Sequence, residues 1–237
     1  MTVYDLIFYL ASFCAVVFVF APHEYAHAFV AYKNGDATAK IHGRLTLNPL
    51  KHIDPIGFVS CALVGFGWAK PVPVNPANFR NYKKGLFATA IAGVVVNYVI
   101  AFIAYALFLL ILRLGAYLNV NSLFAEYVVL FFETFFWRLF SMSLCVFVFN
   151  LLPFYPLDGF RIVESLTRSV NPVQKFLREY GQVILIVLIV ESFLCDILVR
   201  FGVDWATDFN ILNYILGFAT DIIGFPVRAA WDWILTV

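Results

Sequence analysis

The chain has 237 residues, of which 62 % are hydrophobic and 13 % charged, and its net charge is +1. Soluble domains carry about 25 % charged residues, so this composition excludes an ordinary soluble protein and predicts an all-α polytopic membrane protein in contact with the lipid bilayer. The small net charge and the lack of a basic arm exclude an electrostatic nucleic-acid surface, and no nucleic acid is expected as a partner.

The first apolar segment runs from about Thr2 to Tyr32 and is long enough to span a bilayer, which takes about 20 residues. It contains the pattern His-Glu-Tyr-Ala-His at positions 23–27. Residues i and i+4 share a helix face, so His23 and His27 can bind one metal ion while Glu24 acts as a base. The alternative is a pair of unrelated histidines, but ionisable residues inside a membrane segment are costly and by default mark a functional site.

A polar region from Lys33 to Lys84 follows and encloses a short apolar island, Ile56–Trp68. The island is too short to span as a helix and is rich in glycine, β-branched and aromatic residues. We expect a re-entrant, β-hairpin-like loop between Gly57 and Gly67, with a surface loop as the alternative.

Further apolar segments bring the expected number of transmembrane segments to about five. The last of them is interrupted by Asp221, Gly224 and Pro226, so an interfacial or broken helix is an alternative there. The four segments are residues 85–114, 124–152, 180–199 and 209–235.

Basic residues predict the orientation of these segments. Eight of the sixteen lie between the first and second segments, and four more lie between the third and fourth. Because lysine and arginine favour cytoplasmic loops, the N-terminus is predicted outside the cell membrane and both basic loops inside. The twelve residues are Lys33, Lys40, Arg44, Lys51, Lys70, Arg80, Lys83, Lys84, Arg161, Arg168, Lys175 and Arg178.

Asp158 follows the third segment, in the sequence Asn-Leu-Leu-Pro-Phe-Tyr-Pro-Leu-Asp-Gly at positions 150–159. Two crossings separate it from His23 and His27, which places all three at the cytoplasmic side. By itself Asp-Gly after two prolines is typical of a turn. A turn can also present a ligand, and a hydrolytic zinc site takes three protein ligands, among which a carboxylate is acceptable. Asp158 is therefore the predicted third ligand.

Together these motifs resemble the site-2 protease family of intramembrane zinc metalloproteases, in its compact bacterial form without PDZ or CBS domains. The resemblance rests on the two motifs above, on Gly43–Pro49, His52–Gly57 and Gly67–Asn75, and on Ala92–Asn97, and it covers about Pro22 to Val163. Val94 stands where the family has proline, and Phe160 where a second glycine is common. Neither departure removes a ligand or the base.

The resemblance implies one Zn²⁺ held by His23, His27 and Asp158, with Glu24 as the general base that activates water. The expected substrates are transmembrane segments of other membrane proteins, cleaved in regulated intramembrane proteolysis. The sequence does not indicate an oligomeric state.

A substrate helix must unwind before cleavage, and its freed backbone groups then need partners. The segment Gly57–Gly67 can supply a strand edge for them. The family pattern adds Asn150 and Asn97 as substrate-binding residues, although both residue types also join helices inside membranes. Residues 1–163 are expected to form the protease core, and 164–237 to add C-terminal membrane helices.

Two other functions compete with this one. A non-catalytic member of the same fold would bind membrane segments without cutting them, which an intact Glu24 disfavours. A metal or proton transporter would use the same four groups as a relay, but transporters often contain internal repeats, and none is evident here.

Overall fold

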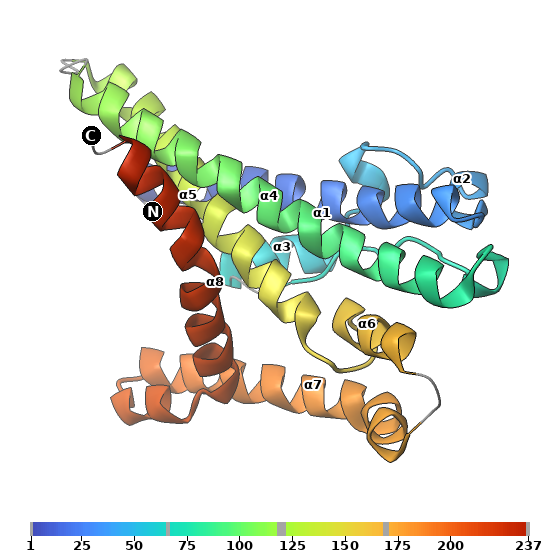
Figure 1. Ribbon diagram of the computed structural model, residues 1–237. Coiled ribbons are helices and arrows are strands. Elements are labelled where there is room, and N and C mark those ends of the chain that lie inside the picture. The colour runs from blue at the N-terminus through green and yellow to red at the C-terminus, as the bar shows by residue number, and fades with distance from the viewer. Residues whose placement is uncertain (1, 65–66, 118–121, 168–170, 236–237) are drawn as a thin grey trace.

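The computed structural model describes residues 2–64, 67–117, 122–167 and 171–235 (Figure 1). Across these ranges the regular secondary structure is helical, apart from one isolated β-bridge, and loops join the helices. Within these ranges, α1, α4, α5 and α7 are long and apolar enough to cross a membrane. The helices are α1 Val3–Lys33, α2 Thr38–Ile41, η1 Pro49–Lys51, α3 Pro55–Val64, η2 Pro76–Asn78, α4 Tyr82–Tyr117, α5 Leu123–Leu151, α6 Asp158–Leu166, α7 Pro172–Arg200, η3 Asp204–Phe209 and α8 Ile211–Leu235.

Helices α1, α4 and α5 pack against one another and form the centre of the molecule. A capping box starts α1: the Thr2 hydroxyl accepts the Asp5 backbone N–H, and the Asp5 carboxylate accepts the Thr2 backbone N–H. Ala11, Ala15 and Ala28 on α1 are completely buried. Small side chains let neighbouring helices approach closely. Close packing of this kind stabilises helix pairs in a bilayer, where the hydrophobic effect contributes little to helix association.

The predicted β-hairpin-like loop is wrong in its first part, because residues 55–64 form helix α3. Asp54 caps this helix: its Oδ1 accepts the backbone N–H groups of Ile56 and Gly57, and Pro55 suits the first helical position. This local capping outweighs the β propensity of the apolar residues. The two ends of the segment do meet, through an isolated antiparallel bridge between Ile53 and Ala69.

The C-terminal part is arranged differently. Helix α7 lies apart from the central bundle and contacts α6, η3 and α8, while α8 returns to pack on α4 and α5 (Figure 1). The predicted fifth segment is thus one helix containing Pro226. Whether this helix spans the membrane stays a prediction. The domain boundary proposed at Val163 falls inside α6.

Candidate metal centre

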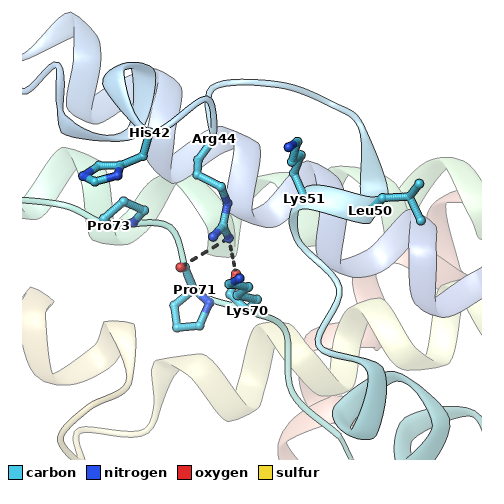
Figure 2. Close-up of a pocket in the computed structure, with 7 residues that line it drawn as sticks. All are labelled: His42, Arg44, Leu50, Lys51, Lys70, Pro71 and Pro73. Atoms are coloured by element: carbon cyan, nitrogen blue, oxygen red, sulfur yellow. Dashed lines mark hydrogen bonds between the residues drawn. The ribbon is translucent and has the colours of Figure 1, made fainter.

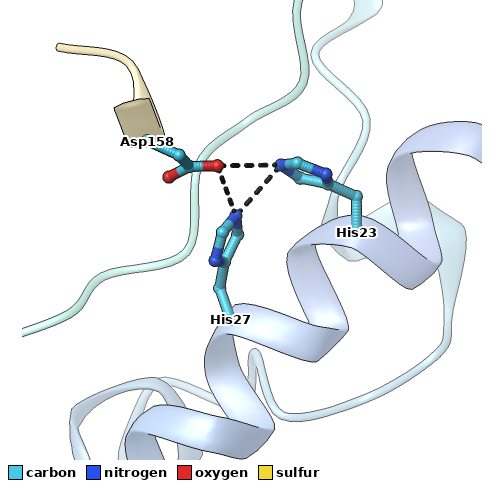
Figure 3. A group of neighbouring side chains, drawn as sticks. All are labelled: His23, His27 and Asp158. Atoms are coloured by element: carbon cyan, nitrogen blue, oxygen red, sulfur yellow. Dashed lines mark hydrogen bonds and ion pairs between the residues drawn. The ribbon is translucent and has the colours of Figure 1, made fainter. Parts of the chain in front are cut away.

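Three side chains from two helices converge on one point (Figure 3). His23 and His27 stand one turn apart on α1, and Asp158 is the first residue of α6. All three are buried, with 4 %, 7 % and 7 % of their surfaces exposed. The structure therefore brings together the three residues predicted as metal ligands, although Asp158 lies 131 positions after His27 in the sequence.

The distances within this group suit zinc. The Nε2 atoms of His23 and His27 are 3.0 Å apart, and Asp158 Oδ2 lies 3.5 and 3.1 Å from them. Four-coordinate zinc with bonds of about 2.0–2.1 Å separates its nitrogen and oxygen ligands by about 3.3 Å. The spacing of the three donor atoms is therefore close to that of three corners of a zinc tetrahedron.

The tautomer of His27 strengthens this fit. His27 Nδ1 is 2.7 Å from the backbone oxygen of Thr89, an acceptor, so Nδ1 carries the proton and Nε2 offers a lone pair. Asp158 Oδ2, buried and without a hydrogen-bond partner in the described chain, offers another. Lone pairs that face one another in a buried site repel, and a cation at their centre relieves the repulsion.

Asn97 on α4 orients the other imidazole. Its side-chain amide lies 3.1 Å from His23 Nδ1, while its Oδ1 is buried and unpartnered in the described chain. Amide nitrogen and oxygen are assigned from their surroundings, and exchanging them lets Oδ1 accept the proton of His23 Nδ1. That arrangement frees His23 Nε2 for a metal and satisfies both groups.

Gly93 makes room for the two rings. A Cβ atom added there would lie 2.4 Å from His27 Nε2 and 2.7 Å from His23 Cε1. No side chain fits at this position while the imidazoles keep their places, so the close approach of α4 to α1 depends on glycine.

Glu24 is held beside the ligands by an extended segment of the long loop. Its Oε2 accepts the backbone N–H of Val72 at 2.7 Å. We call residues 71–74 the strap. Asp36, completely buried, anchors the end of the strap by accepting the Asn75 N–H and the Asn78 side-chain amide.

Glu24 and the three candidate ligands line a hollow of about 120 Å³. At about 30 Å³ per water molecule it has room for roughly four waters. Its lining includes His23, Glu24, His27, Val72, Asn150, Pro156, Asp158 and Arg161.

Comparison with known proteins identifies the family of the chain. The model of peptidase family M50, the site-2 protease family, matches residues 11–191. The chain belongs to this family. It is 42 % identical over 172 residues to a Bacillus subtilis (strain 168) protein named "Putative zinc metalloprotease YwhC", covering 72 % of this chain and 76 % of that protein. No solved structure matches it. The M50 chain is thus a multi-pass membrane metalloprotease that uses zinc.

The M50 site also has an electrostatic basis. When no metal ion is bound, His27 and His23 can carry the protons that a metal would displace. Burial opposes ionisation of Asp158, but in that state the charges and hydrogen bonds of the two imidazoles hold the pKa of its carboxyl well below its usual value. The carboxylate is therefore the form that faces the imidazoles.

The four predicted substrate-binding residues lie in different surroundings. Asn150 lines the hollow and donates its side-chain amide to the Val146 backbone oxygen. Asn97 is completely buried behind His23. Gly57 and Gly67 touch each other: a Cβ on Gly67 would lie 2.0 Å from the Gly57 backbone oxygen. Their role toward substrate stays a prediction.

Three residues that contact the candidate site were not predicted as part of it. Thr89, Gly93 and Val72 act through a backbone oxygen, a missing side chain and a backbone N–H. No residue-type pattern reveals such roles, although Gly93 does lie within the family-like stretch at 92–97.

Proposed function

We propose that the protein is an intramembrane endopeptidase that cleaves transmembrane segments of other membrane proteins in regulated intramembrane proteolysis. One observation carries the proposal: the metal-ligand group and Glu24 share a hollow built on α1, a helix apolar enough to span a bilayer. His23 lies about 30 Å along that helix from Val3, at 1.5 Å per residue, which is about the thickness of the hydrocarbon layer.

In this proposal, His23, His27 and Asp158 hold the zinc ion, which when bound acidifies water and polarises the scissile carbonyl. Glu24 is the general base. Its Oε2 is fixed by the Val72 N–H, which leaves Oε1 to take a proton from water and return it to the leaving amine. Burial of all four side chains limits competing water.

The size of the hollow supports substrate unwinding. A helix is about 10 Å in diameter and does not fit into about 120 Å³. An extended chain would have to enter beside the strap, with Asn150 as a hydrogen-bond partner. Gly57 and Gly67 are the predicted edge for the same strand, and Asn97 contributes by orienting His23.

The basic loops support an orientation in the cell membrane with the N-terminus outside and the catalytic hollow near the cytoplasmic face. A protease core in residues 1–163 with accessory helices in 164–237 remains the proposed division of the chain.

Cleavage of tagged single-span membrane proteins by the purified full chain in detergent tests the function. We expect product from wild type, and a fall of about 10²–10⁴-fold in Glu24→Gln with zinc content unchanged. Glu126→Gln, at an exposed position in the first turn of α5, is the matched control and should cleave like wild type. Zinc removal should stop cleavage and zinc addition restore it. Equal cleavage by Glu24→Gln and wild type would refute Glu24 as the base, and zinc-loaded protein that binds segments without cutting any of them would favour a non-catalytic role.

A further inference from the structure

A second hollow, of about 570 Å³, lies in the long loop and is also bordered by the strap (Figure 2). Four of the residues lining it carry basic side chains, and none is acidic. The hollow shares Pro71 with the catalytic one. Its lining residues are His42, Arg44, Leu50, Lys51, Lys70, Pro71 and Pro73.

Arg44 is the centre of this hollow. The residue is only 9 % exposed, and its Nη2 donates to the backbone oxygens of Lys70 and Pro71 at 2.7 and 3.3 Å. Its Nε finds no hydrogen-bond partner within the described ranges. Figure 2 shows the guanidinium between the strap and Lys51.

The charge of Arg44 is not neutralised. None of the salt bridges among the described residues involves Arg44, Lys51 or Lys70. A buried charge is costly unless it is paired, and carbonyl oxygens supply dipoles but no opposite charge. Two exposed lysines at the same hollow raise the local positive potential further. An anionic ligand would offset this cost.

Phosphate is the anion that fits best. Arginine recognises phosphate through parallel N–H donors, and lysine adds flexible point charges. The surroundings are also apolar: Ile41 and Leu50 are each 80 % exposed, next to His42 and Lys51. Exposed aliphatic side chains beside a basic hollow suit a phosphate carried by a lipid.

We propose that this hollow binds a phosphate group, from the headgroup of an anionic phospholipid or from a free phosphate. Its occupant would lie against the strap whose Val72 holds Glu24. The site does not depend on the proposed peptidase function, because ligand binding can be measured without cleavage.

The test uses the zinc-loaded full chain in detergent and two probes. Inorganic phosphate binding is measured by equilibrium dialysis, and phospholipid retention by native mass spectrometry after incubation with micelles of equal phosphatidylglycerol and phosphatidylcholine. We expect the double variant Lys51→Gln/Lys70→Gln to weaken binding at least about tenfold, and Arg44→Gln to weaken it further. Lys84→Gln, an exposed lysine outside the hollow, should bind like wild type.

Retention of phosphatidylglycerol alone would identify the lipid as the source, and binding of inorganic phosphate alone would identify a soluble ligand. The double variant changes side chains only and keeps the backbone oxygens of residues 70 and 71 that Arg44 contacts, so it remains informative if Arg44→Gln does not fold. The proposal is overturned if wild type retains neither probe, or if the double variant binds as tightly as wild type.

Discussion

Helices α1 and α7 are both long enough to span a membrane, yet their surroundings differ. In the most apolar 18-residue window of each helix, 33 % of the α1 residues are buried inside the protein, against 11 % in α7. The candidate metal ligands and the proposed base lie on α1 and on α6, which packs against α4 and α5, while α7 presents mostly exposed aliphatic side chains. Catalytic groups need neighbours that fix their geometry. The contrast therefore favours a catalytic role for the more buried region around α1. It leaves α7 as a surface that can face lipid or another protein.

Among changes in the buried region around α1, Gly93→Ala should have the largest effect. The new Cβ would displace the His27 and His23 rings, and we expect zinc affinity to fall by about 10–100-fold or more, the range seen when groups around metal ligands are disturbed. Competition with a chelator measures it. Gly217→Ala in α8, where a Cβ meets nothing within 4 Å, is the control and should leave zinc affinity unchanged. Equal zinc affinities would show that the rings can move aside freely.

Two variants of Asn97 test its hydrogen bond to His23. Asn97→Ala removes the acceptor and should lower zinc affinity by about tenfold. Asn97→Asp keeps an oxygen at the same place and should retain most of that affinity. If both variants lose zinc equally, Asn97 acts through packing between α1 and α4 instead.

Asp36 tests the support of the strap. Burial by itself raises the pKa of this carboxyl. Hydrogen bonds from Thr38, Asn78 and Asn75 have the larger, opposite effect, so the pKa lies below its usual value. Asp36→Ala leaves those donors unpaired and should cost about 1–3 kcal/mol in free energy of unfolding, with reduced cleavage and normal zinc content. Thermal unfolding and the cleavage assay measure both effects. Asp208→Ala at an exposed position is the control, and an equal loss in both variants would contradict the role of Asp36.

The smallest effect is expected on α7. Val19 on α1 is 1 % exposed and Val187 on α7 is 59 % exposed, so the same change at each compares the two regions directly. Val19→Ala should cost about 2 kcal/mol because it leaves a cavity, whereas Val187→Ala should stay within about 0.5 kcal/mol. Unfolding in detergent measures both. Similar losses would mean that α7 is covered by protein.

The sequence predicted that His23, His27 and Asp158 lie together because their proximity follows from helix spacing and from the order of the membrane segments. Helical spacing joins His23 to His27, and the count of crossings brings Asp158 to the same membrane face. The amide contact of Asn97, the space left by Gly93 and the N–H of Val72 depend on how α4 and the strap pack on α1, which no periodicity encodes. Helix α3 was missed because the cap at Asp54 outweighed the β propensity of the residues that follow.

The most direct measurement is X-ray absorption at the zinc edge of the purified protein, with zinc content determined in parallel. We predict one zinc per chain with two imidazole nitrogens and a carboxylate oxygen at about 2.0–2.2 Å. His27→Ala and Asp158→Ala should each lose most of the metal. Sulfur ligands at about 2.3 Å, or zinc retained at full occupancy in both variants, would contradict the site at His23, His27 and Asp158.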